Sequence, residues 1–383
     1  MVPIIQRHTL ELQELVAQAS ATHEVLDVYK LAKRFTLETF VEIGFGRKLG
    51  LLASGLDHPF EVAFDEAHHT AAARFNSPAW LWKLKRSLNI GSERHLREDM
   101  VVINQFVMEI IASAMERRQL QGENPAHGGD LEQPLNKDIV SIVLDTMEAS
   151  GHAVTPTEVR DIALAGLIAG RDTTGDSLSW LLHMLHQNPR VEGKLRAEIL
   201  ATIPKMTESE SYMPSMEEVQ SLQYLEATVR EVLRLFPPVP IIPYNCIRDT
   251  VFPDGTFIPV GTDISLLTYA SGRIPSVWGP DAADFLPERF LDGKTGNLLQ
   301  MPPTKFAAFS AGPRVCVGRN LAMLEMKIVI TCLVSRFYLA QVPGQDVRYI
   351  RGVTLGMKNP LLMQVESIAV GPEVVASTPA THA

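Results

Sequence analysis

The sequence predicts a mainly α-helical fold with a small β region. Apolar residues recur at helical spacing through most of 1–120, an unbroken helical pattern fills 155–188, and strand-like segments are confined to 240–267. Because single large folds reach this length, we expect one domain over 1–370. The small residues of 371–383 predict a frayed C-terminal tail.

The composition is that of an ordinary globular protein, with 46% hydrophobic and 21% charged residues. The net charge is −9 and no basic block occurs, so we expect no nucleic-acid partner. Cys246, Cys316 and Cys332 are widely spaced, which predicts neither a disulfide framework nor a zinc site and fits a reducing compartment. The sequence as given contains no recognisable membrane anchor or signal peptide.

Five amphipathic helices are predicted in the first part of the chain. They are Leu10–Ala19, Val25–Ile43, Pro59–Arg74, Trp80–Leu88 and Glu93–Arg118. In the fourth helix, Trp80 and Trp82 are interleaved with basic residues, a pattern typical of helices that lie on a membrane surface. The alternative is that the tryptophans pack in a core while the lysines extend to solvent, and the sequence alone leaves both open.

A long helix is predicted to begin at Thr155, where Pro156 and Glu158 complete a capping box. From Ile162 to Ala169 the pattern is apolar on every side, which predicts burial all round. His183 and His186 lie three positions apart near its end, but no third metal ligand is suggested, so a packed or solvated pair is favoured over zinc.

The middle of this helix, Ala169–Gly175, contains two glycines, two threonines and a carboxylate, against helical preference. Such a conflict typically marks a functional site. Gly170 and Gly175 are expected to lower the helix wall and make room for a small ligand. Asp172 and Thr173 would place an acid and a hydroxyl beside that ligand. The alternative is a simple kink with a solvated aspartate.

The next helix is predicted over Ser215–Phe236 and again starts with a capping box. Glu231 and Arg234 share one face of it, at a spacing that permits an ion pair. After this helix the residue pattern predicts short β-strands, with a turn at Pro253–Gly255.

One cysteine stands inside a glycine-bounded loop, Phe309–Gly318, directly before another predicted helix. Gly312 and Gly318 allow positive φ and a close approach to a flat ligand. The helix N-terminus after Cys316 stabilises negative charge and therefore favours a thiolate. The alternative is that Cys316 is an inert buried thiol, as most lone cysteines are.

The loop resembles the haem-binding signature of the cytochrome P450 family, Phe-x-x-Gly-x-Arg-x-Cys-x-Gly, at every fixed position. Ala169–Thr173 is similar to the oxygen-activation motif of that family, and Glu231–Arg234 is similar to its Glu-x-x-Arg motif. Pro287–Phe290 resembles the segment that supplies its second arginine. The resemblance implies a cytochrome P450 fold.

The resemblance also implies a cofactor, haem b (iron protoporphyrin IX), and residues that hold it. Cys316 would be the axial iron ligand, Arg314 would neutralise a haem propionate, and Phe309 would pack against the sulfur. The other implied haem-binding residues are small: Gly312, Gly318, Ala169 and Gly170.

Two further roles follow from the same resemblance. Thr173 would hydrogen-bond dioxygen, and Asp172 would relay protons from solvent. Glu231, Arg234 and Arg289 would form a buried network behind the haem, which is costly to break.

The implied activity is that of a monooxygenase, which inserts one atom of O2 into a C–H bond of an apolar substrate. Its electrons would come from an NADPH-dependent reductase or another donor. The motifs look most like the branch that hydroxylates fatty acids and alkanes at the chain end, and the family implies an endoplasmic reticulum membrane. Two alternatives stay open: a haem-thiolate isomerase or dehydratase acting on a peroxide, and a non-catalytic fragment.

The fragment alternative rests on the start of the chain. By resemblance, we expect an N-terminally truncated cytochrome P450 fold in which the membrane anchor, most of the main sheet and a propionate-binding helix are absent.

The pairing of Asp172 with Thr173 favours the monooxygenase over the isomerase, because only the monooxygenase must protonate dioxygen.

Overall fold

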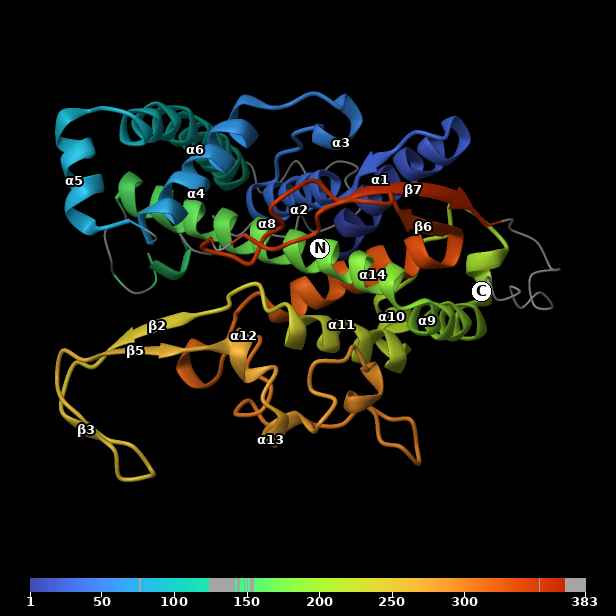
Figure 1. Ribbon diagram of the computed structural model, residues 1–383. Helices are drawn as coiled ribbons and strands as arrows, with labels where there is room; N and C mark the ends of the chain where they lie inside the picture. The colour runs from blue at the N-terminus through green and yellow to red at the C-terminus, as the bar shows by residue number, and fades with distance from the viewer. Residues whose placement is uncertain are drawn as a thin grey trace.

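The computed structural model describes residues 1–75, 77–123, 155–350 and 352–368, together with positions 142, 145–147, 149 and 151. The predicted tail at 371–383 lies outside these described residues. One long helix, α8 (Pro156–Gln187), runs through the middle of the molecule (Figure 1). The helices that precede it in the chain lie on one side of it, and most of the later helices and hairpins lie on the other.

The predicted helices of the first third are confirmed, most of them with slightly longer bounds. The helices of this part are α1 (Val2–Thr22), α2 (Val28–Phe45), α3 (Leu51–Ser54), α4 (Pro59–Phe75), α5 (Ala79–Leu88) and α6 (Ser92–Glu123). Among these helices, the short α3 was not predicted. Its N-terminus is capped by a side chain from α2, because the Glu38 carboxylate accepts the backbone N–H groups of Leu49, Gly50 and Leu51.

Helix α8 begins as the sequence predicts. The Thr155 hydroxyl accepts the Glu158 backbone N–H at 3.3 Å, and the Glu158 carboxylate accepts the Thr155 backbone N–H at 2.9 Å. The helix is 32 residues long. Neither α8 nor any other helix in the described part of the chain combines the length and apolarity needed to cross a membrane.

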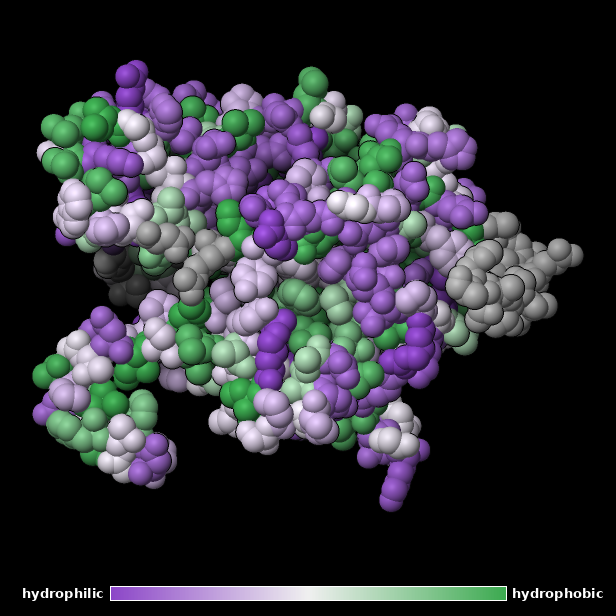
Figure 2. Space-filling model, viewed as in Figure 1, coloured by the Kyte–Doolittle hydropathy of each residue, from purple (hydrophilic) through white to green (hydrophobic). Residues whose placement is uncertain are grey.

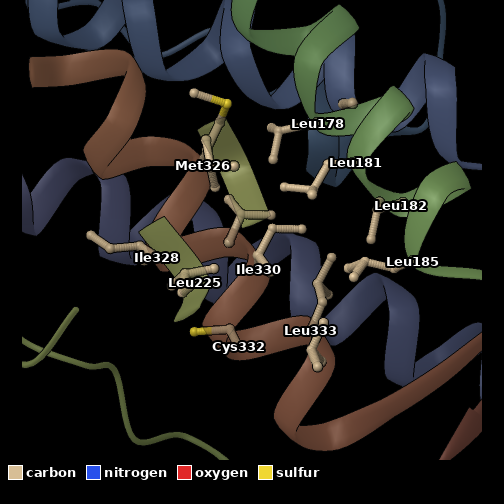
Figure 3. Close-up of a cluster of buried hydrophobic side chains, with 14 of the residues drawn as sticks. Leu178, Leu181, Leu182, Leu185, Leu225, Met326, Ile328, Ile330, Cys332 and Leu333 are labelled. Atoms are coloured by element: carbon tan, nitrogen blue, oxygen red, sulfur yellow. The ribbon is translucent and has the colours of Figure 1, made fainter. Parts of the chain in front are cut away.

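The main core lies where α8 meets α11 (Gln223–Leu235) and α14 (Arg319–Arg336). Figure 3 shows leucines of α8, among them Leu178 and Leu181, facing Met326 and Ile330 of α14. Cys332 lies in the same cluster with no exposed surface, so it serves as a core residue. This packing fixes α14 against α8, and α14 starts at the cysteine loop.

The β structure is small, as predicted. Its strands are β1 (Leu26–Asp27), β2 (Ile242–Asn245), β3 (Thr250–Val251), β4 (Phe257–Ile258), β5 (Asp263–Leu266), β6 (Phe337–Gln341) and β7 (Leu362–Ser367). The hairpin around Pro253–Gly255 is confirmed as β3 and β4, and β2 pairs with β5. The three-stranded sheet in the order β1-β7-β6 was not predicted, because it joins strands from both ends of the chain.

The single helix predicted over Ser215–Phe236 is wrong. It is divided into α10 (Met216–Ser221) and α11, with Leu222 extended between them. The physical reason is a distant cap, because the Glu198 carboxylate accepts the N–H groups of Tyr224 and Leu225 at 2.7 and 2.9 Å. The remaining helices are α9 (Pro189–Thr202), α12 (Thr268–Ser271) and α13 (Pro275–Trp278).

Candidate active site

Cys316 lies on the loop that leads directly into α14, three positions before the first helical residue. Its backbone N–H donates to the Phe309 carbonyl oxygen at 2.9 Å, which closes the loop. Ser310 and Gly312 turn the chain with φ of 59° and 62°. Gly318 has φ −84°, so the expectation that it also needs positive φ is wrong. The left-handed turn lies earlier, at Ser310 and Gly312.

Residues 311–317 are exposed, whereas Phe309 at the start of the loop is half-buried and packs against the main core. Cys316 is exposed, whereas Cys246 and Cys332 are buried, so the alternative of an inert buried thiol is wrong for Cys316. Val317 is fully exposed (101%). Arg314 is also exposed, and it forms no ion pair with any residue that the structure describes. The loop thus presents a thiol and a free guanidinium two positions apart.

Gly170 and Gly175 of α8 pack against α2. A Cβ on Gly170 would lie 2.1 Å from the Phe40 ring, and one on Gly175 would lie 3.0 Å from the Lys33 side chain and 3.2 Å from the Thr36 hydroxyl. On the side of the helix where their Cβ atoms would lie, these glycines leave no room for a small ligand, so the expectation is wrong for that side. They allow α2 and α8 to approach closely instead.

A different face of α8 is open. Ala165 and Ala169 are exposed and Thr173 is half-buried, four residues apart along the helix. Ile162 and Ile168 are 41% and 36% exposed, so the prediction that this part of α8 is buried all round is wrong. The Thr173 hydroxyl donates to the Ala169 carbonyl at 2.6 Å, and its oxygen can still accept a hydrogen bond. This stripe of α8 is therefore accessible to solvent.

Asp172 lies in a buried cluster of charges and is only 1% exposed, so the alternative of a solvated aspartate is wrong. Its carboxylate is 2.9 Å from Lys33 Nζ, 2.9 Å from His68 Nδ1 and 3.0 Å from the Arg171 guanidinium. Burial opposes ionisation, but Lys33, the His68 hydrogen bond and Arg171 outweigh it and hold the pKa of Asp172 well below its usual range. Asp172 is therefore a carboxylate at neutral pH.

A cavity of about 930 Å³, lined by many charged residues, adjoins this cluster. Its wall includes all four members of the cluster, Lys33, His68, Arg171 and Asp172. The cavity is large enough for several ordered water molecules, and its charged wall offers them hydrogen-bond partners. Solvent can therefore reach the edge of the cluster although Asp172 itself is buried.

Glu231, Arg234 and Arg289 lie together, as the resemblance implies. Arg234 makes two bonds to the Glu231 carboxylate at 2.6 and 2.7 Å, and Arg289 Nε lies 3.2 Å from the same carboxylate. The backbone N–H of Leu286 donates to Glu231 at 2.8 Å. Arg234 also binds three backbone carbonyls, those of Gly272, Ala282 and Asp284. These bonds join α11 to the segment that leads to the cysteine loop.

The two histidines of α8 are half-buried, and both contact Gln341. His183 Nδ1 lies 2.9 Å from the Gln341 side chain, and its ring meets Trp180 edge to face. His186 accepts the Gln341 backbone N–H at 3.4 Å. Nowhere in the described ranges do three or more His, Cys, Asp or Glu side chains form a group that could hold a metal ion.

The family model described as cytochrome P450 matches residues 1–365 of this chain. The chain belongs to the cytochrome P450 family. That match covers the cysteine loop, the open face of α8 and the Glu231 network, which are the three features that the sequence motifs identified.

Known cytochromes P450 are similar to almost the whole chain. Cytochrome P450 86B1 of Arabidopsis thaliana is 31% identical over 94% of this chain and 64% of its own length. Cytochrome P450 CYP94D108 of Paris polyphylla is 33% identical over 93% of this chain and 69% of its own length. Noroxomaritidine synthase of Narcissus is 33% identical over 82% of this chain and 59% of its own length. The chain thus spans about 59–73% of the relatives it matches.

The family implies a haem cofactor, and the residues present fit one. A thiolate is the protein ligand that such a haem needs, and Cys316 offers an exposed thiol at the start of a helix. A haem also carries carboxylates, and Arg314 offers a guanidinium without another partner among the described residues. The donor set of this loop therefore matches the chemistry of the cofactor.

Sequence reasoning missed the partners of Asp172. Lys33 lies 139 positions earlier in the chain and His68 lies 104 positions earlier. Both occur on amphipathic helices where a charged residue normally faces solvent, so no local signal separates them from their neighbours. The one available signal is that Asp172 interrupts a buried helix and therefore needs a cationic partner.

Proposed function

We propose that this protein is a haem-thiolate monooxygenase that inserts one atom of O2 into a C–H bond of an apolar substrate. The observation that supports the proposal most directly is the Cys316 loop, because it presents a free thiol and the Arg314 guanidinium together. Cys316 would hold the iron of haem b, and Arg314 would hold a propionate. When bound, the haem supplies the activation of dioxygen and the oxidation of the substrate.

The residues of α8 would handle the protons. The Thr173 hydroxyl donates its hydrogen to the Ala169 carbonyl, so the lone pairs of the same oxygen can accept a hydrogen bond from a ligand on the open face of α8. The low pKa of Asp172 makes its carboxylate a poor proton acceptor, so Asp172 would support the proton relay by holding the side chains of Lys33 and His68 in place. His68 contacts Asp172 and also forms part of the wall of the 930 Å³ cavity, so it would carry protons between the buried cluster and solvent. Electrons would come from an NADPH-dependent reductase or another donor.

The substrate class is a finer part of the proposal. A second cavity of about 510 Å³ lies between α4, α6 and α8, and most of its wall is apolar. The volume lies in the range of about 300–1,000 Å³ that is typical of small-molecule sites. We infer a fatty acid or an alkane as the substrate, with oxidation at or near the chain end.

Association with a membrane surface is proposed from α5. Trp80, Leu84 and Leu88 are 67%, 49% and 58% exposed and recur every four residues, so they form one apolar stripe. Figure 2 shows hydrophobic side chains gathered over this part of the molecule. Lys83 is exposed on the same short helix and suits anionic headgroups. The core alternative fails for Trp80, because no residue of α5 is buried.

This contact is tested by sedimentation with vesicles that contain anionic lipid. Trp80→Ser should weaken binding several-fold, because aromatic side chains anchor interfacial helices. A matched control is Tyr338→Ser, another exposed aromatic that lies on β6. Equal binding of both variants would count against the contact.

The monooxygenase proposal is tested by the absorption spectrum of the reduced protein with carbon monoxide. A red-shifted Soret band is expected from thiolate ligation, and Cys316→Ala should abolish it. Cys246→Ala, at a buried cysteine on another loop, should retain it. Retention of the band in Cys316→Ala would overturn the assignment of the ligand. Reductant-dependent oxygen uptake separates a monooxygenase from a peroxide isomerase.

A further inference from the structure

The apolar cavity has two chemically different ends. Helices α4 and α6 run antiparallel along it, because Arg74 near the end of α4 pairs with Glu93 at the start of α6 at 2.7 Å. At the other end Phe60 of α4 stacks on Phe106 of α6, with ring centroids 4.1 Å apart. Arg74 lies ten positions after Phe64, about 15 Å along the helix. The end beside α5 therefore holds the charged side chains of Arg74 and Glu93, whereas the rest of the wall is mostly apolar, with His68 as an exception.

The apolar end adjoins the open part of α8. Phe64 lines the cavity, and the Arg171 guanidinium of α8 lies 5.2 Å from its ring centroid. Leu164 and Ile168 of α8 also line the cavity, and Ile168 precedes the exposed Ala169. A ligand that fills this cavity would therefore reach α8 at Leu164 and Ile168, which directly precede the exposed Ala165 and Ala169 in the chain.

The charged end has an excess of positive charge. Arg74 is neutralised by Glu93, and this ion pair holds the pKa of Glu93 below its usual value. Arg86 from α5 and Arg97 from α6 line the cavity as well, and Arg97 follows Glu93 by one helical turn. Both are exposed, and within the described ranges neither forms an ion pair. Three guanidinium groups thus share this end with one carboxylate among the described cavity-lining residues, because Glu93 lies within electrostatic reach of Arg86 as well as Arg74.

We propose that Arg86 and Arg97 bind the carboxylate of an amphiphilic substrate whose alkyl chain fills the cavity. Guanidinium groups suit this task, because their planar fork matches a carboxylate and keeps its charge at every physiological pH. The inference rests on the proposed function and refines it, since it selects fatty acids over alkanes. It also explains why oxidation would fall far from the carboxylate: the anchored end lies at α5 and α6, and the free end lies at α8 (Figure 1).

The experiment measures equilibrium binding to the haem-loaded protein by calorimetry. Three ligands of one chain length are compared: dodecanoate, methyl dodecanoate and dodecanol. Dodecanoate should bind about tenfold more tightly than the two neutral ligands, since a charge-assisted hydrogen bond contributes roughly that much. The double variant Arg86→Gln/Arg97→Gln should lose this preference while its affinity for the ester stays the same.

The matched control is Arg94→Gln. Arg94 also lies on α6, but it pairs with Glu98 at 2.9 Å and does not line the cavity. This variant should keep the tenfold preference, and circular dichroism should show equal helix content in all variants. The proposal is overturned if wild type binds acid and ester equally, if it binds none of the three, or if Arg94→Gln loses as much as the double variant.

The two proposals fail in different ways. A red-shifted carbon monoxide band together with equal binding of acid and ester would refute the carboxylate anchor and leave the monooxygenase proposal standing. A preference for the acid in a protein that gives no such band would refute thiolate ligation and leave the anchor standing.

Discussion

The Glu231 network and the Cys316 loop are both identified by short motifs, yet their environments are opposite. Glu231 is fully buried and Arg234 is 2% exposed, and their opposite charges are paired with each other inside the protein. On the loop, Val317 is fully exposed, and Cys316 and Arg314 are exposed as well. The network satisfies its charges within the protein, whereas the loop presents its groups to a ligand.

This difference separates two kinds of motif residue. A charge that has all its partners within the chain contributes mainly to stability, because removing one partner leaves the others buried and unpaired. An exposed group without such partners can be removed at little cost to folding. Substitutions in the network should therefore lower the free energy of unfolding, and substitutions in the loop should change ligand binding instead.

The largest expected effect is at Glu231. Glu231→Gln keeps the size of the side chain but leaves the Arg234 guanidinium buried beside a neutral group. Loss of one partner of a buried ion pair costs about 3–5 kcal/mol. We expect a decrease of that size in the free energy of unfolding, measured by chemical denaturation at neutral pH.

The control for this prediction is Glu98→Gln, which breaks the exposed pair with Arg94 on α6. Exposed pairs at this spacing contribute about 0.3–0.5 kcal/mol. A Glu231→Gln variant as stable as Glu98→Gln would contradict the view that the network is a buried structural unit.

The limits of sequence-based prediction follow the same division. The residues with motif spacing, Glu231, Arg234 and Cys316, could be chosen because their residue types and order are fixed by chemistry. The backbone carbonyls that bind Arg234 and the Glu198 cap that divides α10 from α11 could not, because a backbone or long-range partner has no residue-type signature. Local periodicity likewise predicts helices well and the β1-β7-β6 sheet poorly, because that sheet pairs residues far apart in the chain.

Helix α8 shows a third limit. Gly170 interrupts the helical pattern, and the sequence could not tell whether a ligand or another helix fills the space beside it. The structure gives that space to Phe40. An apolar run on all sides of a helix likewise cannot distinguish a face covered by protein from a face left open for a ligand, as at Ile168 and Ala169.

The second prediction concerns Glu325, which lies on α14 where the helix passes from the cysteine loop into the core. Helix α14 starts exposed at the loop, but Glu325, nine positions after Cys316, is buried, and burial raises its pKa to about 8. The unfolded carboxyl has a pKa of about 4.3, so the folded state holds this proton more tightly. Its contribution to stability is complete below the unfolded pKa and is lost as pH rises towards 8.

Glu325→Gln should remove that pH dependence. Wild type is expected to lose on the order of a few kcal/mol between pH 5 and 8, and the variant to lose much less. Thermal unfolding at both pH values measures the difference. A wild-type protein as stable at pH 8 as at pH 5 would contradict the burial of the Glu325 side chain in the folded protein.

The smallest effects should come from a matched pair of glycines. A Cβ on Gly272 would lie 2.2 Å from the Arg234 carbonyl oxygen, so Gly272→Ala must move backbone and should cost about 1–3 kcal/mol. A Cβ on Gly318 would meet only Cys316 Sγ, at 3.9 Å, so Gly318→Ala should cost below about 1 kcal/mol in the haem-free protein. The ranking, read from urea denaturation, would reverse if the loop rather than the network were the tightly packed region.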